Sequence, residues 1–366
     1  MLYQKIIRPL LFRFTDPETI HHAVIKGLGL ISQVPLINSA IKQRCLVNDP
    51  RLQVQIGKLR LKNPIGLSAG FDKNVEAPLA YPMLGFGWAE LGSITYSGQP
   101  GNPRPRLWRL PKDQGLIVYY GLSNNGACKV TNELKKLGQK PNPISLGLSI
   151  APTTGLKLEQ MTDDYIKSIL AIHAYADYIT LNVSCPNVAA CDIFSQISFI
   201  ENLAASVRAA MTRHNISKDL FLKIGPGHSD ADLDRIINAC LKNNFTGIIA
   251  TNLIKNRRLA TFQSSPNELN HPGGISGRCL QDLSNRAISY LYKQSQGRLK
   301  IIGVGGIFTA DDAYRKIKLG ASAVQLITGF IYGGPLVIRQ INLGLLKLLD
   351  QDGLKTLSQA VGRDIN

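Results

Sequence analysis

Between Pro64 and the end of the chain, short apolar runs alternate eight times with longer amphipathic stretches. The apolar runs predict strands at Ile65–Ser68, Ala89–Thr95, Ile144–Ile150, Tyr178–Val183, Leu220–Ile224, Gly247–Ala250, Lys300–Val304 and Ala323–Leu326, preceded by a hairpin from Leu52 to Leu61. A helix is predicted after each strand, near 74–84, 126–137, 162–175, 197–213, 230–243, 279–295, 310–319 and 335–350. Eight consecutive strand–helix units match a TIM (β/α)8 barrel, and we predict this α/β fold. A doubly wound open sheet is the alternative, although it seldom needs eight units in a row.

The first 45 residues lack this alternation and predict three amphipathic helices. Apolar residues recur at helical spacing up to Phe14 and again after Asp16-Pro17, a typical helix start, and Pro35 begins a third stretch. Six Lys and Arg against two acidic residues give this segment a net charge of +4. Basic helices of this kind can lie in a membrane interface or simply cap the globular core. We therefore divide the chain into an N-terminal helical segment, 1–45, and a barrel, 46–366.

The whole chain of 366 residues carries 42 Lys and Arg against 25 Asp and Glu, a formal charge of +17. This surplus favours anionic partners, but no run of five like charges occurs, so nucleic acid is not indicated. The six cysteines form no CxxC and no zinc spacing, which predicts no metal site and suits a reducing compartment. Lys5, Arg8 and Arg13 interrupt the N-terminal apolar residues, and no run approaches the ~20 apolar residues that cross a bilayer. We expect neither a secretion signal nor a membrane span.

The chemistry of a TIM barrel lies where its strands end, and several predicted strands end in polar side chains. Lys73 follows the first strand and Lys223 ends the fifth, so each places a cation at the mouth of the barrel. The fourth strand ends in Asn182-Val183-Ser184-Cys185-Pro186-Asn187, where two carboxamides suited to a planar polar substrate flank a cysteine that can act as nucleophile or base. Asn252 adds a carboxamide after the sixth strand. The alternative interpretation is that the lysines are ordinary solvated charges and that the cysteine is buried and inert.

Glycine-rich segments gather after the last three predicted strands. They are Gly273-Gly274-Ile275-Ser276-Gly277, Gly303-Val304-Gly305-Gly306 and Thr328-Gly329. Loops in this part of a TIM barrel commonly bind phosphate through backbone N–H groups. No single run is specific, but their joint position predicts a phosphate site.

Two long stretches resemble the signatures of the dihydroorotate dehydrogenase family, FMN enzymes of pyrimidine synthesis built on a TIM barrel. The first runs from Gly87 through GSITYSGQPGNPRPR to Arg106, and the second, IIGVGGIFTADDAYRKIKLGA, from Ile301 to Ala321. The N-terminal DPETIHH resembles the helices of the class 2 enzymes, which dock on the membrane and form a quinone tunnel. The resemblance covers nearly the whole chain. It implies oxidation of (S)-dihydroorotate to orotate by a membrane quinone, in de novo pyrimidine (UMP) biosynthesis, at the cytoplasmic face of the inner membrane.

The same resemblance implies roles for individual residues. Those implied to hold FMN are Ala69, Gly70, Lys73, Ser93, Ser149, Asn182, Lys223, Thr251, Gly277, Gly306, Ile327, Thr328 and Gly329. Those implied to hold the substrate are Lys73, Asn182, Asn187 and Asn252. Cys185 would take the C5 proton of dihydroorotate while the C6 hydride passes to the flavin, and Arg109 would lie at the quinone site.

The chain also departs from the class 2 pattern. The base there is normally serine, whereas Cys185 stands in an N-x-S-C-P-N motif similar to that of class 1. Apolar Val118, Leu122, Leu253 and Ile327 replace, respectively, an asparagine, a phenylalanine, a threonine and a tyrosine, and Ser149 replaces an asparagine. Each lost polar partner costs a buried ligand about 1–3 kcal/mol. Two alternatives therefore stay open: a diverged FMN oxidoreductase with a less polar substrate, and a non-catalytic protein that binds anionic lipid or nucleic acid.

Overall fold

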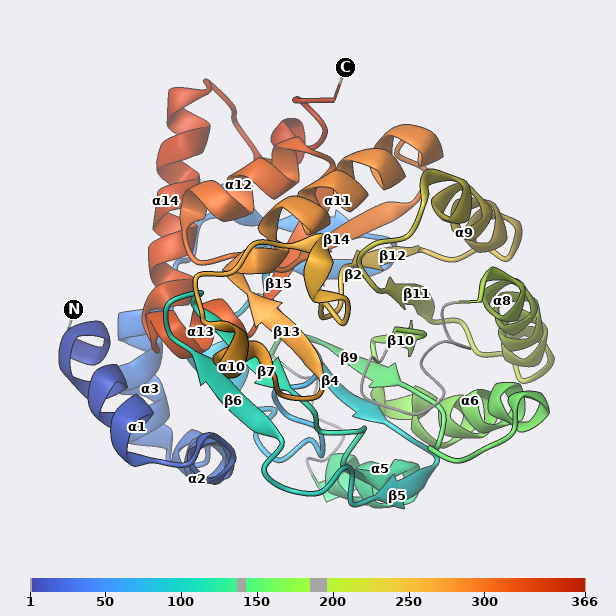
Figure 1. Ribbon diagram of the computed structural model, residues 1–366. Coiled ribbons are helices and arrows are strands. Elements are labelled where there is room, and N and C mark those ends of the chain that lie inside the picture. Colours follow the sequence, from blue (N-terminus) through green and yellow to red (C-terminus); the bar gives the residue numbers. More distant parts are fainter. Residues whose placement is uncertain (1, 137–142, 185–195, 366) are drawn as a thin grey trace.

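Eight parallel strands close into a barrel in the computed structural model, which describes residues 2–136, 143–184 and 196–365 (Figure 1). In order around the barrel they are β3 (Ile65–Leu67), β4 (Trp88–Ile94), β9 (Ser145–Ile150), β10 (Tyr178–Asn182), β11 (Asp219–Ile224), β12 (Gly247–Ala250), β14 (Lys300–Val304) and β15 (Ala321–Leu326). The predicted TIM barrel is confirmed, and the strand ends differ from the predicted ones by at most two residues.

Helices surround the barrel as predicted, with one exception. They are α5 (Ala127–Lys136), α6 (Leu158–Ile172), α8 (Ile197–Arg213), α9 (Asp230–Lys242), α11 (Gln281–Ser295), α12 (Ala310–Lys318) and α14 (Val337–Gln351), with a short α13 (Thr328–Gly333) before the last. The helix predicted near 74–84 is wrong, because only α4 (Ala80–Met83) forms there. The buried Asp72 carboxylate accepts hydrogen bonds from the N–H groups of Glu76 and Ala77, at 2.9 Å each, and holds the preceding residues in turns.

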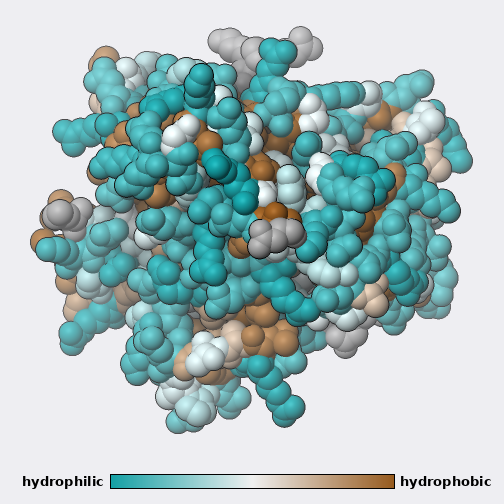
Figure 2. All heavy atoms as spheres, turned by 90° about the horizontal axis from the view of Figure 1, so that it is seen from above, coloured by the Kyte–Doolittle hydropathy of each residue, from teal (hydrophilic) through white to brown (hydrophobic). Residues whose placement is uncertain are grey.

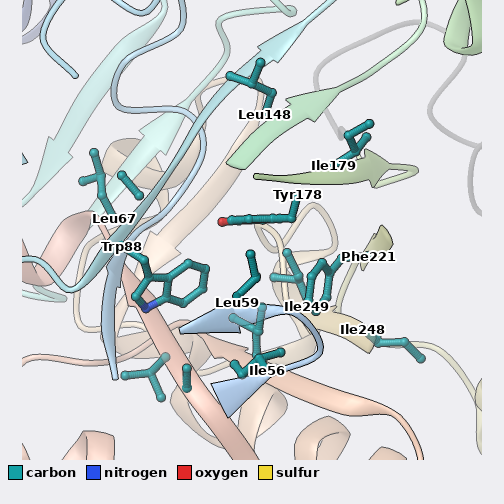
Figure 3. Packing of buried hydrophobic residues seen from close by; sticks show 14 of the residues in the cluster. Ile56, Leu59, Leu67, Trp88, Leu148, Tyr178, Ile179, Phe221, Ile248 and Ile249 are labelled. Carbon is teal, nitrogen blue, oxygen red and sulfur yellow. The ribbon is translucent and has the colours of Figure 1, made fainter. Parts of the chain in front are cut away.

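The core fills the barrel and is closed at one end by the predicted hairpin. Strands β1 (Val54–Ile56) and β2 (Leu59–Leu61) pair antiparallel. Ile56 and Leu59 pack beneath the buried rings of Trp88, Tyr178 and Phe221 (Figure 3). The functional end is therefore the opposite one, where the parallel strands finish. The face in Figure 2 is mostly hydrophilic, with hydrophobic residues in small separate groups.

Short strands inserted after the barrel strands were not predicted. Strands β6 (Leu107–Leu110), β7 (Gly115–Val118) and β13 (Gly274–Gly277) form an antiparallel sheet in the order β13-β7-β6. Strand β5 (Ser97–Gln99) pairs with β8 (Asn124–Gly126), and α10 (Pro266–Leu269) lies near β6 (Figure 1). The short 3-10 helices are η2 (Pro50–Leu52), η3 (His173–Tyr175), η4 (Arg257–Leu259), η5 (Arg278–Leu280) and η6 (Leu357–Ala360). The β6-β7-β13 sheet supplies side chains to the functional end.

The N-terminal helices lie along one side of the barrel, beside α14 and β6 (Figure 1). They are a π-helical turn η1 (Tyr3–Ile7), α1 (Arg8–Phe14), α2 (Pro17–Ser32) and α3 (Pro35–Cys45). The predicted start of α2 is confirmed, because Asp16 Oδ1 accepts a hydrogen bond from the N–H of Thr19 at 2.8 Å. Large apolar side chains remain exposed on these helices, among them Leu2, Ile6, Leu10, Phe14, Leu30 and Leu36. No single helix in the described ranges is long and apolar enough to cross a membrane; α2 and α3 together are, but with a bend of 108° between them.

Candidate active site

A cavity of about 1250 Å³, including its solvent-open part, lies at the carboxyl ends of the barrel strands. The predicted site residues that line it are Ala69, Gly70, Lys73, Ser93, Asn182, Lys223, Thr251, Asn252, Gly277, Gly306, Ile327, Thr328 and Gly329. Ser149 and Arg109 do not line this cavity. Cys185 and Asn187, the predicted base and one predicted substrate ligand, lie outside the described residues.

Asn182 and Ser93 form the polar wall at the ends of β10 and β4. Asn182 Nδ2 donates to Ser93 Oγ at 2.8 Å, and Ser93 Oγ lies 2.9 Å from Ser149 Oγ. Ser149 therefore stands behind Ser93, because it reaches the cavity only through that hydroxyl. The backbone carbonyl of Asn182 accepts a hydrogen bond from Tyr165 at 2.8 Å, which fixes the end of the strand.

Lys223 lies directly beside Asn182, its register partner on β11. Its side chain is 4% exposed, and its Nζ donates to Ser68 Oγ at 3.1 Å. Behind it, Glu90 Oε1 lies 3.7 Å from Nζ. Burial lowers the pKa of Lys223, and the carboxylate of Glu90 opposes this change. A buried cation therefore stands at the cavity wall.

Asn252 closes the polar wall from the end of β12. Its Nδ2 donates to the carbonyl of Ser184 at 2.9 Å and lies 3.1 Å from Ser184 Oγ. Ser184 Oγ lies 3.0 Å from Asn182 Oδ1. These contacts bring Asn182 and Asn252, two of the three predicted carboxamides, into one network.

The glycine-rich segments after the last strands meet at one side of the cavity. Gly306 has a φ of +69°, and a Cβ there would stand 2.5 Å from Gln281 Cβ. A Cβ on Gly329 would stand 1.9 Å from the carbonyl oxygen of Ile307. Beside them Ser276 Oγ and Thr328 Oγ1 lie 2.9 Å apart. Backbone that no side chain covers, together with two hydroxyls, suits a phosphate group.

Lys73 supplies a second cation, half-buried above an aromatic ring. Its Nζ stands 3.9 Å from the ring centroid of Tyr120. Burial lowers the pKa of Lys73 to about 8, although Asp72 and Glu18 oppose the change. On the side of the N-terminal helices, burial and the charge of Lys73 lower the pKa of His21 to about 3, so this ring lines the cavity in its neutral form. Neither Tyr120 nor His21 was predicted, and only the DPETIHH resemblance pointed near His21.

Apolar side chains form much of the remaining lining. Val118, Leu122, Leu253 and Ile327 all reach the cavity. Four of the departures noted in the sequence therefore fall in the cavity itself. They reduce the hydrogen-bonding capacity of the cavity, and one of them, Leu253, lies directly beside the carboxamide of Asn252.

Arg109 lies at the contact between β6 and the N-terminal helices. Its Nη1 donates to the carbonyls of Phe12 and Thr15, at 3.0 and 2.7 Å, and its guanidinium lies 4.7 Å from the Phe12 ring. It lines a second, more open cavity with Trp108 and His271, whose rings stack 4.4 Å apart. The predicted quinone residue thus joins α1 and the residue that follows it to the barrel.

Comparison with known proteins decides the family. A family model described as dihydroorotate dehydrogenase matches residues 51–349. A protein of Nostoc punctiforme named dihydroorotate dehydrogenase (quinone) is 37% identical over 100% of this chain and 98% of its own length. The chain belongs to the dihydroorotate dehydrogenase family.

Other relatives agree with this assignment. The Acaryochloris marina dihydroorotate dehydrogenase (quinone) is 36% identical, with 99% of both chains covered. The crystal structure of DHODH from Eimeria tenella in complex with ferulenol has a TM-score of 0.84 and 31% identity, covering 98% of both chains. The dihydroorotate dehydrogenase family uses FMN, and the quinone-type relatives match the N-terminal helices as well as the barrel. No cluster of three His, Cys, Asp or Glu suited to a metal occurs within the described ranges.

Proposed function

We propose that this protein oxidises (S)-dihydroorotate to orotate with FMN as cofactor and a membrane quinone as electron acceptor, in de novo pyrimidine (UMP) biosynthesis. The observation that carries the proposal is one cavity that joins two buried or half-buried cations, a wall of carboxamides and a glycine-lined end. Full-length similarity to proteins named dihydroorotate dehydrogenase (quinone) supports the same reaction.

The residues of the cavity fit FMN. Thr251 Oγ1 is buried without a hydrogen-bond partner among the described residues, and Gly306 and Gly329 line the cavity without a side chain, so a phosphate can approach their backbone there. The residues that would hold FMN are Ala69, Gly70, Lys73, Ser93, Asn182, Lys223, Thr251, Gly277, Gly306, Ile327, Thr328 and Gly329, with Ser149 acting through Ser93. When bound, FMN supplies a hydride acceptor that quinone can reoxidise.

The chain itself binds the substrate and moves one proton. Lys73 pairs with the substrate carboxylate, and the carboxamides of Asn182, Asn252 and Asn187 bind the ring amides. Cys185, in its thiolate form, removes the proton from C5 while the hydride leaves C6, so the C5–C6 bond becomes a double bond. Leu116, Val118 and the other apolar side chains exclude water from the reacting face.

The N-terminal segment, 1–45, serves in this proposal as the membrane-associating and quinone-tunnel part, and 46–366 as the FMN-binding barrel. Exposed leucine, isoleucine and phenylalanine side chains on basic helices support a peripheral position at an anionic membrane face, on the cytoplasmic side of the inner membrane. His21 of this segment lines the main cavity, and Arg109 lines the second cavity together with Phe12 and Thr15, which supports quinone access from the side of the N-terminal helices.

The deciding experiment is an assay of the purified full chain. We expect flavin absorbance, and reduction of a short-chain quinone that depends on dihydroorotate. Cys185→Ala should slow flavin reduction steeply, whereas Cys128→Ala, at an exposed cysteine on α5, should not. Protein that stays colourless after reconstitution with FMN would contradict the proposal, and an unchanged rate in Cys185→Ala would remove the base.

A second candidate is favoured by the apolar lining at Val118, Leu122 and Leu253, namely an FMN oxidoreductase for a less polar substrate. Flavin-bound protein without dihydroorotate turnover would favour it. Val118→Asn then discriminates between dihydroorotate and a less polar substrate. If dihydroorotate is the substrate, a restored hydrogen bond of about 1.4 kcal/mol lowers its dissociation constant about tenfold.

A further inference from the structure

A buried carboxylate that the proposed reaction does not use lies beneath the cavity. Glu90 stands on β4 with its side chain fully buried inside the barrel. Its Oε2 accepts hydrogen bonds from Thr180 Oγ1 at 2.8 Å and from Gln325 Nε2 at 3.3 Å. Its Oε1 has no hydrogen-bond partner among the described residues and faces Lys223 Nζ at 3.7 Å. This carboxylate is therefore held in place by neutral groups and directed at one cation.

Lys223 connects that carboxylate to the cavity. Its Nζ touches Ser68 on one side and Glu90 on the other, while the residue lines the cavity. Tyr178 is the other titratable side chain that packs against this pair. Its pKa is raised well above the usual value by burial and by the Glu90 charge, so it stays neutral. Lys223 and Glu90 thus form a pair of opposite charges whose positive end faces the cavity.

We propose that Glu90 is a positioning residue that acts through Lys223: it keeps the amine protonated and offsets its field, and so sets the reduction potential of a flavin in the cavity. This inference rests on the proposed function, because it needs the flavin site. Reduction adds negative charge to the flavin, which a nearby cation stabilises and a nearby anion destabilises. In a poorly solvated interior both effects are much stronger than in water.

Glu90→Gln separates the two effects of the carboxylate. The variant keeps the size of the side chain and an oxygen that accepts from Thr180, but it removes the negative charge. Burial then acts on Lys223 without opposition, so its pKa falls further and the amine loses its proton at a lower pH. Below that pH an unopposed cation favours reduced flavin; above it the cation is gone.

The test is a dye-equilibrated reductive titration of the flavin-loaded full chain between about pH 6 and pH 9. In Glu90→Gln we expect the ratio of reduced to oxidised flavin, at a fixed potential and low pH, to rise at least tenfold. For a two-electron couple this equals about 30 mV. This increase in the ratio should disappear as the pH rises and Lys223 loses its proton. The ratio in Glu90→Gln should therefore show a pH-dependent step that is absent from the parent protein. Thr180→Val is the matched control, because it removes a hydrogen bond to Glu90 and keeps both charges.

Lys223→Met removes the cation and leaves the carboxylate, so the ratio should fall at least tenfold. Adding Glu90→Gln to Lys223→Met should then raise the ratio at least tenfold without a pH-dependent step, because no amine is left to titrate. This comparison answers the question if Glu90→Gln alone does not fold. The role of Glu90 would be overturned if the ratio of reduced to oxidised flavin in the flavin-loaded variants stays within threefold of the parent value at all pH values. Absence of flavin from the parent protein would instead overturn the proposed function, so the two failures are distinguishable.

Discussion

Glu18 fastens α2 to the barrel, and its removal is the sharpest structural test of how the N-terminal segment is held. Its carboxylate is 4% exposed and accepts hydrogen bonds from Arg106 Nε, at 3.1 and 3.2 Å, and from Nη2 at 2.8 Å. Arg104 Nη2 lies 3.0 Å away. Burial raises the pKa of Glu18, but the hydrogen bonds and charges of the two arginines outweigh it and leave the pKa below its usual value.

We predict that Glu18→Gln weakens the attachment of α2 by about 3 kcal/mol. Removing one partner of a buried ion pair costs about 3–5 kcal/mol, because the remaining charge is left uncompensated. The lower end applies here, since Arg106 Nη1 keeps the carbonyls of Pro100 and Asn102 as acceptors, at 2.7 and 2.8 Å. Arg104 is 60% exposed and regains water instead.

Hydrogen exchange of the α2 amides measures this loss directly. A weakening of about 3 kcal/mol corresponds to local opening that is roughly 150-fold more frequent. Glu133→Gln is the control, because its pair with Lys136 is exposed and its loss costs about 0–0.5 kcal/mol at α5. If α2 in Glu18→Gln exchanges within threefold of the parent rate, the ion pair does not hold the segment and the reasoning fails. The pKa of Glu18 is lower in the folded protein than in the unfolded chain, so the stabilisation that this carboxylate gives is complete above about pH 4.5. The stabilisation is lost as the pH falls through the lower pKa of the folded state.

Three further predictions follow from the site and the helices. Lys73, with a pKa near 8, carries its charge below that pH, so the KM for dihydroorotate should rise as the pH increases through about 8; a flat KM from pH 7 to 9.5 would refute its role. Gly306→Ala should abolish flavin retention, measured by absorbance after gel filtration, because its Cβ meets Gln281 at 2.5 Å. Gly155→Ala is the control and should retain flavin, because Gly155 also has a positive φ, of +86°, but open space around it. Gly27→Ala lies inside α2 with nothing within 4 Å of the new Cβ, so it should stabilise the helix by about 0.5–1 kcal/mol. The α2 amides should then exchange more slowly, and faster exchange would contradict the open space at this position.

The barrel was predictable because its strands and helices each carry their own signal. Buried parallel strands such as β11 are mostly apolar runs, and Ser229 caps the start of α9 with a hydroxyl that accepts from the N–H of Asp232. The ends of parallel strands meet at one face, so Asn182, Lys223 and Asn252 could be placed together before their contacts were known.

The features that could not be predicted depend on tertiary contacts, which leave no local pattern in the sequence. The helix predicted at 74–84 is replaced by turns because Asp72 is buried and binds N–H groups that a helix would use otherwise. Strands β6 and β13 are about 165 residues apart in the chain and meet only through β7, so no short-range spacing marks their sheet. Glu90 reads as one polar residue in a strand, and its pairing with Lys223 appears only when the barrel closes.

The contacts of the N-terminal segment show how its charge is distributed between its outer and inner faces. Its two acidic residues are Asp16, exposed at the start of α2, and Glu18, which the structure buries against Arg106. The outward surface of the segment is therefore more basic than its net charge of +4 indicates, because one of its two negative charges is turned inward. That inward charge also supports Lys73, since Glu18 opposes the fall in the pKa of the lysine. The same carboxylate thus fastens the segment, leaves its outer face cationic for an anionic membrane, and favours the charged form of a lysine in the cavity. Exchange at α2 and the pH dependence of KM should consequently change together in Glu18→Gln, the second moving to lower pH.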